Sequence, residues 1–267
     1  MSFRNRDAFL MIPGLASRVF LSLVLLVSTS SFAALPATIA RIKPGIVGVG
    51  SYQLTRTPAA LLSGSGFVVG NGHYVITNLH VVNRPLDYPR KEYLAVFVGR
   101  GSRSGVRRAG KIAIDPRHDL ALLKIWGEPL KPLRLGASEK VKEGELYAFT
   151  GFPIGAVLGL YPVTHRGIIS AITPIVTPMD RSDQLSARLI KRLRSPYNVF
   201  QLDATAYPGN SGSPLYDPET GKVIAVVNMV FVKGTKESVL KDPSGITYAM
   251  PARYVRALMR SAGIAEP

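Results

Sequence analysis

The sequence predicts an all-β protein, a sandwich or barrel of antiparallel strands. Short segments rich in β-branched and aromatic residues recur along the chain, separated by glycine, asparagine and proline. After residue 33, helical periodicity occurs in only two places. A proline-containing stretch from Trp126 to Gly136 divides the strand segments into two groups. Two packed antiparallel barrels fit this division.

The first 33 residues are expected to be a secretory signal peptide. Arginines precede the apolar run Val19–Val27, which is too short to cross a hydrocarbon core of about 30 Å. Small residues follow and favour cleavage after Ala33. We therefore expect an exported protein of the bacterial periplasm. Secretion, or tethering by an uncleaved signal, is the alternative.

The remaining segments follow in order. In the first group, strands are expected at Gly45–Leu54, Gly64–Gly70, His73–Thr77, Tyr93–Gly99, Gly110–Pro116 and Asp119–Ile125. In the second group, they are expected at Glu145–Pro153, Val163–Ile172, Val199–Ala204, Val223–Val232 and Gly245–Pro251. The helical segments are Asp180–Arg194 and Ala252–Gly263, and the glycine ends the second of them.

Composition limits the chemistry. The chain has no cysteine, which excludes disulfides, cysteine-based zinc sites and a thiol nucleophile. No metal-ligand cluster or phosphate loop is apparent, and no cofactor is expected. The net charge is +16, with basic clusters at Arg84–Arg108 and Arg181–Arg194. These clusters are either solvated faces or attract anionic lipid, polysaccharide or acidic proteins; nucleic acid is not expected after export.

Three residues suggest a catalytic site. Ser211 lies in the turn GNSGSP, and a serine hydroxyl needs a base to become a nucleophile. His80 lies in VITNLHVV, where a β-rich run ends in a turn, and Asp119 opens the apolar segment DLALLKI. Taken singly, each residue is more often structural. Together, the order His80, Asp119, Ser211 is one of three chain orders found for Ser-His-Asp triads.

These motifs resemble those of the trypsin-like serine proteases. TNLHVV, HDLALLKI and GNSGSP resemble the histidine, aspartate and nucleophile motifs of that family. Without cysteines, the chain is most similar to the Deg/HtrA protease domain and the glutamyl endopeptidases, from about Ile42 to Tyr254. The resemblance implies a protease domain at 34–267 with no PDZ domain. Its two packed six-stranded antiparallel β-barrels fall at about 42–127 and 141–250, with a C-terminal helix at about 252–262.

The resemblance also implies roles for single residues. His80 is the general base and then the acid, Asp119 orients it, and Ser211 forms an acyl-enzyme with a polypeptide substrate. The backbone amides of Gly209 and Ser211 form the oxyanion hole. Asn210 replaces the aspartate that pairs with a new amino terminus in trypsin, so zymogen cleavage is not expected.

The substrate pocket is expected to be short, apolar and uncharged, which suits small aliphatic residues before the cut. Its expected members are Thr205, Val227, Asn228, Met229 and Val230. His118 is expected to be a solvated neighbour of Asp119, and His165 a strand residue with no direct role. Two other functions stay open: a binding protein without turnover, and an envelope factor with chaperone-like binding.

Overall fold

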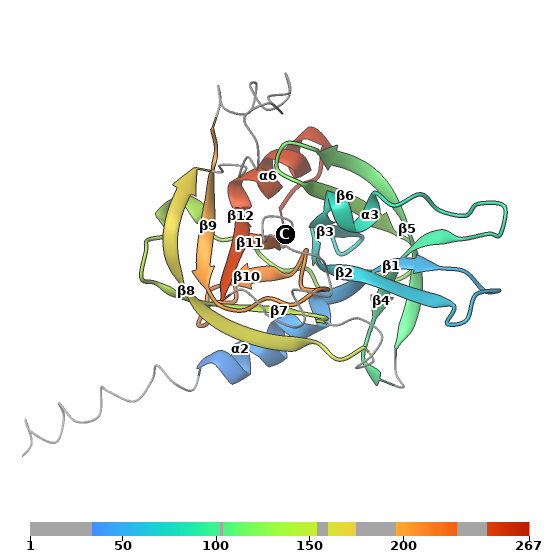
Figure 1. The fold of residues 1–267 in the computed structure, drawn as a ribbon, viewed down its shortest axis with the longest axis horizontal. Coiled ribbons are helices and arrows are strands. Elements are labelled where there is room, and N and C mark those ends of the chain that lie inside the picture. Colours follow the sequence, from blue (N-terminus) through green and yellow to red (C-terminus); the bar gives the residue numbers. More distant parts are fainter. Residues whose placement is uncertain (1–33, 102–103, 154–159, 175–195, 229–244, 267) are drawn as a thin grey trace, which may run out of the picture.

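The computed structural model describes residues 34–101, 104–153, 160–174, 196–228 and 245–266. Within these ranges the chain forms two closed antiparallel β-barrels of six strands each, as the sequence predicts (Figure 1). The signal segment and the helix expected at Asp180–Arg194 lie outside the described residues. Among the described residues, no helix is long and apolar enough to span a membrane.

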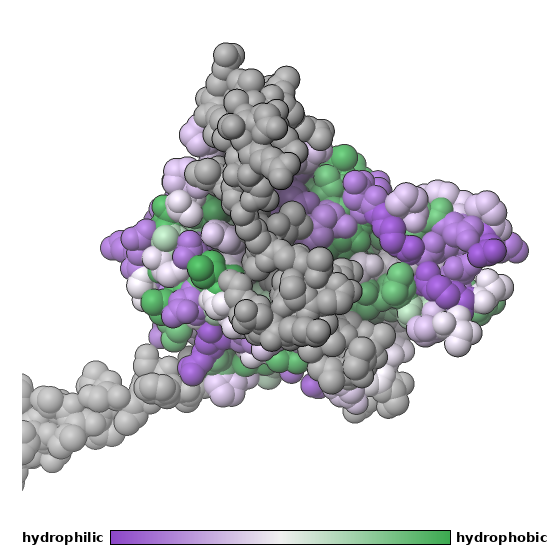
Figure 2. All heavy atoms as spheres, viewed as in Figure 1, coloured by the Kyte–Doolittle hydropathy of each residue, from purple (hydrophilic) through white to green (hydrophobic). Residues whose placement is uncertain are grey.

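The first barrel closes in the order β1-β2-β3-β6-β5-β4. Its strands are β1 (Ile46–Tyr52), β2 (Ala60–Val69), β3 (Tyr74–Asn78), β4 (Tyr93–Val98), β5 (Gly105–Asp115) and β6 (Leu120–Ile125). A short helix, α3 (Leu79–Val82), follows β3 directly. Valine and leucine side chains fill the interior of this barrel. Figure 2 shows hydrophilic side chains gathered at its outer end, at the right of the view.

The second barrel closes in the order β10-β11-β12-β9-β8-β7. Its strands are β7 (Leu146–Gly151), β8 (Val163–Pro174), β9 (Asn198–Asp203), β10 (Pro214–Tyr216), β11 (Val223–Asn228) and β12 (Ile246–Pro251). The helices outside the barrels are α2 (Ala34–Ile42) and α6 (Ala252–Ser261), with 3₁₀ turns at Lys43–Gly45 and Ser138–Lys140. Neither α2 nor the three-residue strand β10 was expected from the sequence.

One hydrophobic cluster joins the two barrels to α6. Phe67 and Ile76 of the first barrel belong to the same cluster as Tyr216 and Met250 of the second and Val255 of α6. Burial of such large side chains is worth about 1.5–3 kcal/mol each. The barrels are therefore held against each other by a shared core, and residues from both can meet at a fixed site.

Candidate active site

His80 and Asp119 form a direct pair in the first barrel. Asp119 Oδ2 lies 2.5 Å from His80 Nδ1, and Asp119 Oδ1 accepts the His80 backbone N–H at 2.9 Å. The backbone carbonyl of Asp119 also accepts the Leu79 N–H at 3.0 Å, so Asp119 makes three hydrogen bonds to α3. Because an ionised carboxylate only accepts hydrogen bonds, the contact places the imidazole proton on Nδ1. Nε2 of the neutral ring then keeps a free lone pair.

The backbone at Asp119 explains how the carboxylate reaches α3. Asp119 has a φ of 53°, which lies in the left-handed region that few residues other than glycine adopt. Aspartate and asparagine tolerate this conformation better than other side chains. The turn directs the carboxylate away from the following strand β6 and back toward His80.

Asn228 is a further residue at this pair, and the sequence analysis did not find its contact. Its Nδ2 donates to Asp119 Oδ2 at 2.9 Å, and Asn78 Nδ2 donates to the Asp119 carbonyl at 3.0 Å. The sequence analysis assigned Asn228 to a wall of the substrate pocket. Its buried side-chain amide also holds the carboxylate from the second barrel.

Ser211 lies in the turn between β9 and β10, and it is only 5% exposed. Its carbonyl accepts the Ser65 N–H at 2.8 Å, and the next residue, Gly212, donates its N–H to the Val227 carbonyl at 2.9 Å. Gly212 has a φ of 88°, and a Cβ there would lie 2.0 Å from the Ser65 carbonyl oxygen. The glycine is therefore required for the turn to pack against β2.

The turn leaves two backbone amides free. Gly209 has a φ of 102°. Among the described residues, neither the Gly209 nor the Ser211 N–H has an acceptor. Two unpaired N–H groups next to a serine hydroxyl are what an oxyanion hole needs.

Ser65 on β2 connects the first barrel to this turn. Its hydroxyl donates to the Gly209 carbonyl at 2.7 Å and accepts the Phe152 N–H at 2.9 Å. The Ser65 carbonyl accepts the Thr77 hydroxyl at 2.7 Å. With the backbone bond to Ser211, Ser65 holds the turn on both sides of Asn210. This cross-barrel contact has no signal in the sequence.

Asn210 is fully buried, and neither side-chain polar atom has a hydrogen-bond partner among the described residues. A carboxylate at this position would be a buried charge, which costs several kcal/mol unless a cation pairs with it. Close packing surrounds the side chain, since a Cβ on Gly151 would lie 1.9 Å from Ser213 Oγ and 3.0 Å from Asn210 Oδ1.

Gly64 on β2 is the point where the segments of His80 and Ser211 come together. A Cβ on Gly64 would lie 2.7 Å from Val81 Cγ2 and 2.9 Å from the Ser211 carbonyl oxygen. The segments that carry His80 and Ser211 thus pack on one glycine. The two side chains form no hydrogen bond with each other in the described structure. Such contacts are often long without substrate and shorten in the reactive complex.

The expected pocket residues are placed only in part. Thr205 is half-buried in the loop before Gly209, and Val227 is fully buried in the core of the second barrel. Met229 and Val230 lie outside the described residues. His165 on β8 stacks on Phe149, with ring centroids 4.9 Å apart, and its ring lies 6.1 Å from that of Tyr207 in the same loop. Burial lowers the pKa of His165, which keeps the ring neutral near pH 7.

The expectation for His118 is wrong. Its Nδ1 lies 2.5 Å from Asp115 Oδ2, and its ring stacks on Tyr254 of α6 at a centroid distance of 3.8 Å. Tyr197 packs edge-on against the same ring at 4.6 Å. His118 is therefore a packed residue beneath α6, because the turn before Asp119 folds inward.

A family model described as a trypsin-like peptidase domain matches residues 64–226. The chain belongs to the trypsin-like peptidase family. Among curated proteins, a probable periplasmic serine endoprotease, DegP-like, from Marinomonas sp. (strain MWYL1) is 31% identical over 204 residues, or 73% of this chain and 34% of the relative.

Two other relatives agree with this family. The protein of the same name from Pseudomonas putida (strain GB-1) is 33% identical over 171 residues, or 64% of this chain and 30% of the relative. Serine protease HTRA1 from Xenopus laevis is 30% identical over 225 residues, or 82% of this chain and 41% of the relative. The chain thus spans about a third of the length of the first curated relatives it matches.

Proposed function

We propose that the protein is an exported serine endopeptidase that hydrolyses peptide bonds through an acyl-enzyme. One observation carries this proposal: the hydrogen-bonded His80–Asp119 pair belongs to a segment that packs on Gly64 together with the Ser211 turn, and that turn leaves two backbone amides free. The names of the relatives support both the reaction class and a periplasmic location.

The chemistry assigns one role to each group. Ser211 Oγ attacks the carbonyl carbon of the scissile bond while His80 Nε2 takes the hydroxyl proton. Asp119 keeps the ring in the required tautomer and stabilises the imidazolium. The Gly209 and Ser211 amides stabilise the oxyanion. His80 then gives the proton to the leaving amine, and a water activated by His80 hydrolyses the acyl-enzyme.

We infer a preference for small aliphatic residues before the cut. Thr205 carries no charge, and Val227 offers no partner to an acidic side chain. The lowered pKa of His165 removes another source of positive charge near this loop. The resemblance also assigns the apolar residues Met229 and Val230 to this pocket. A peptide library with cut sites read by mass spectrometry tests the preference, and cuts mainly after Lys, Arg, Glu or Phe would overturn it.

We further infer that the protein needs no zymogen cleavage. A new amino terminus cannot form an ion pair with Asn210 as it would with an aspartate. Removal of the signal after Ala33 should therefore suffice for activity.

The alternative is a binding protein, or a chaperone-like factor, on the same fold. The absence of a hydrogen bond between His80 and Ser211 is the observation that favours it. Peptidase kinetics on mature protein starting at Ala34 separate these functions, because only the protease turns over substrate.

The decisive variants follow from the assigned roles. Ser211→Ala and His80→Ala should each lower kcat by about 10⁶, with the double variant little worse, because the residues act as a unit. Asp119→Asn should keep the fold and lower kcat by about 10⁴ through the wrong tautomer. Full turnover by Ser211→Ala, with melting temperatures unchanged, would end the assignment of the nucleophile.

A further inference from the structure

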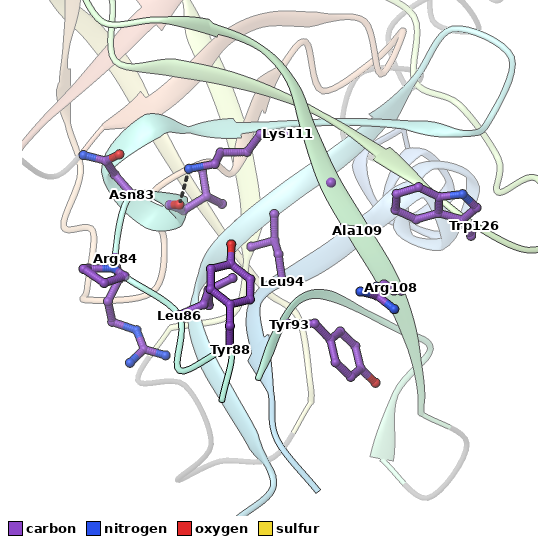
Figure 3. A pocket seen from close by; sticks show the side chains of 13 residues that line it. Asn83, Arg84, Leu86, Tyr88, Tyr93, Leu94, Arg108, Ala109, Lys111 and Trp126 are labelled. Carbon is purple, nitrogen blue, oxygen red and sulfur yellow. Dashed lines mark hydrogen bonds between the residues drawn. The ribbon is translucent and has the colours of Figure 1, made fainter. Parts of the chain in front are cut away.

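A half-open cavity of about 490 Å³ lies in the first barrel, away from Ser211 (Figure 3). The segment after α3 forms one side, and β4, β5 and the end of β6 form the other. The residues that decide its chemistry are Leu86, Tyr88, Tyr93, Arg108, Lys111 and Trp126. None of the residues assigned to the proposed reaction lines it.

The cavity opens where β4 and β5 separate. Their pairing ends at Ala95 and Arg108, and from Ala109 onward β5 pairs with β6. Tyr93 and Leu94 of β4 pair with β1 on their other side. The facing edges of β4 and β5 therefore border the cavity, and no backbone pairing joins these edges there. A polypeptide backbone can hydrogen-bond to such edges, whereas a hydrocarbon chain cannot.

The lining is positively charged. Among the described residues that line the cavity, none is acidic. Arg108 lies over the Tyr93 ring at 5.5 Å, and Lys111 Nζ donates to the Val82 carbonyl at 3.3 Å. Neither cation forms an ion pair with a described carboxylate, while the third lining cation, Arg84, is paired with Glu92. Two charges thus remain for an anionic partner.

Large aromatic side chains are exposed at the same place. Tyr88 is 72% exposed, and Trp126 is 52% exposed. Gly110 lets the indole lie close over β5, because a Cβ there would lie 3.0 Å from Trp126 Cη2. Exposed aromatic rings beside unpaired cations are typical of sites that bind protein partners.

We propose that this cavity binds an acidic polypeptide segment with an aromatic or large aliphatic anchor side chain. The anchor packs between Trp126, Tyr88 and Leu86. Carboxylates of the segment pair with Arg108 and Lys111, and its backbone bonds to the separated strand edges. Val82 lines the cavity at the end of α3, two residues after His80, so the site adjoins the helix that carries the proposed base.

Trp126 makes the site directly observable, because it is the only tryptophan of the chain. The probe is a twelve-residue peptide of glutamate and serine with one central phenylalanine. It is titrated against the full mature chain carrying Ser211→Ala, which prevents consumption of the peptide. We expect a saturable change in tryptophan fluorescence that weakens with salt. Peptides with lysine for glutamate, or alanine for phenylalanine, should bind much more weakly.

Variants locate the binding. Arg108→Gln with Lys111→Gln removes both charges but keeps polar side chains, and it should weaken binding about tenfold, the sum expected for two exposed ion pairs. Arg260→Gln, an exposed cation on α6, is the matched control and should leave affinity unchanged. Circular dichroism melts verify that all variants fold.

Three results would overturn the proposal. One is the absence of a saturable signal. Another is unchanged affinity in the double variant, which would place the peptide elsewhere, such as the substrate cleft. The third is a signal from phosphatidylglycerol vesicles but not from the peptide, which would make the site lipid-binding.

Discussion

Replacing Ser65 with alanine tests whether the hydrogen bond from Ser65 to Gly209 orients the backbone amides that are proposed to bind the oxyanion. The variant removes a hydroxyl that contacts the Gly209 carbonyl at 2.7 Å and the Phe152 N–H at 2.9 Å. It leaves the backbone bond from Ser65 to the Ser211 carbonyl at 2.8 Å. Because buried polar groups without partners cost about 1–3 kcal/mol, we expect the free energy of unfolding to fall by about that amount.

The kinetic effect should exceed the effect on stability. Without the Ser65 hydroxyl, the peptide after Gly209 is held only by the Asn210 N–H bond to the Tyr207 carbonyl at 2.9 Å, so the backbone at Gly209 can shift and change the direction of its own N–H. Complete loss of one oxyanion donor costs about 10²–10³ in kcat, so partial misalignment should cost about 10–10². KM should change little, because Ser65 is fully buried and does not meet the substrate.

The assay is steady-state peptidase kinetics with a chemical-denaturation curve for each variant. Thr77→Val is the matched control, since it removes a buried hydrogen bond to the same residue's carbonyl, at 2.7 Å, without touching Gly209. It should lower stability comparably while keeping kcat within about threefold of the parent, well below the loss of one oxyanion donor. If both variants lose kcat equally, Ser65 is merely structural and the reasoning is refuted.

Three other changes have defined outcomes. Asn228→Ala removes a donor to Asp119 and should lower kcat about 10- to 100-fold at nearly constant fold, measured by the same assay. Gly212→Ala should cost at least about 1–3 kcal/mol of unfolding free energy, because its φ is 88°, and a denaturation curve checks this. Burial would raise the pKa of Glu92, but hydrogen bonds from the Asp87 N–H, Ser51, Arg56 and Arg84 outweigh it and lower the pKa to about 2. Because the pKa is lower in the folded state, the ionised Glu92 stabilises the fold above pH 4.5. This stabilisation is lost as the pH falls from 4.5 to 2. Glu92→Gln should therefore lose about 3 kcal/mol at pH 7 and show a flatter pH dependence between 5 and 2 in unfolding titrations; an unchanged slope would contradict this.

Local patterns predicted most of the architecture. Short apolar segments bounded by turn residues marked every strand except β10, whose three residues are too few for a pattern. The expectation that His80 and Asp119 meet came from the resemblance of their motifs to those of the family, and the two side chains do form a hydrogen bond. The partial burial of His118 was not predicted, because nothing in the sequence around His118 indicates that the ring of Tyr254 stacks on it.

Contacts between the barrels could not be predicted. Ser65 meets Gly209 across 144 positions of sequence, and Asn228 meets Asp119 across 109. Both are small polar residues in ordinary strand segments. Their partners are set by how the two barrels pack, and the shared core that fixes this packing has no linear signature.

The central claim is that Ser211 is a nucleophile activated by His80. The most direct measurement is reaction of mature protein starting at Ala34 with a fluorophosphonate probe, followed by mass spectrometry of the digest. We predict one adduct on Ser211, much slower labelling in His80→Ala, and none in Ser211→Ala. No adduct, an adduct on another residue, or labelling only after a further internal cut would contradict the claim.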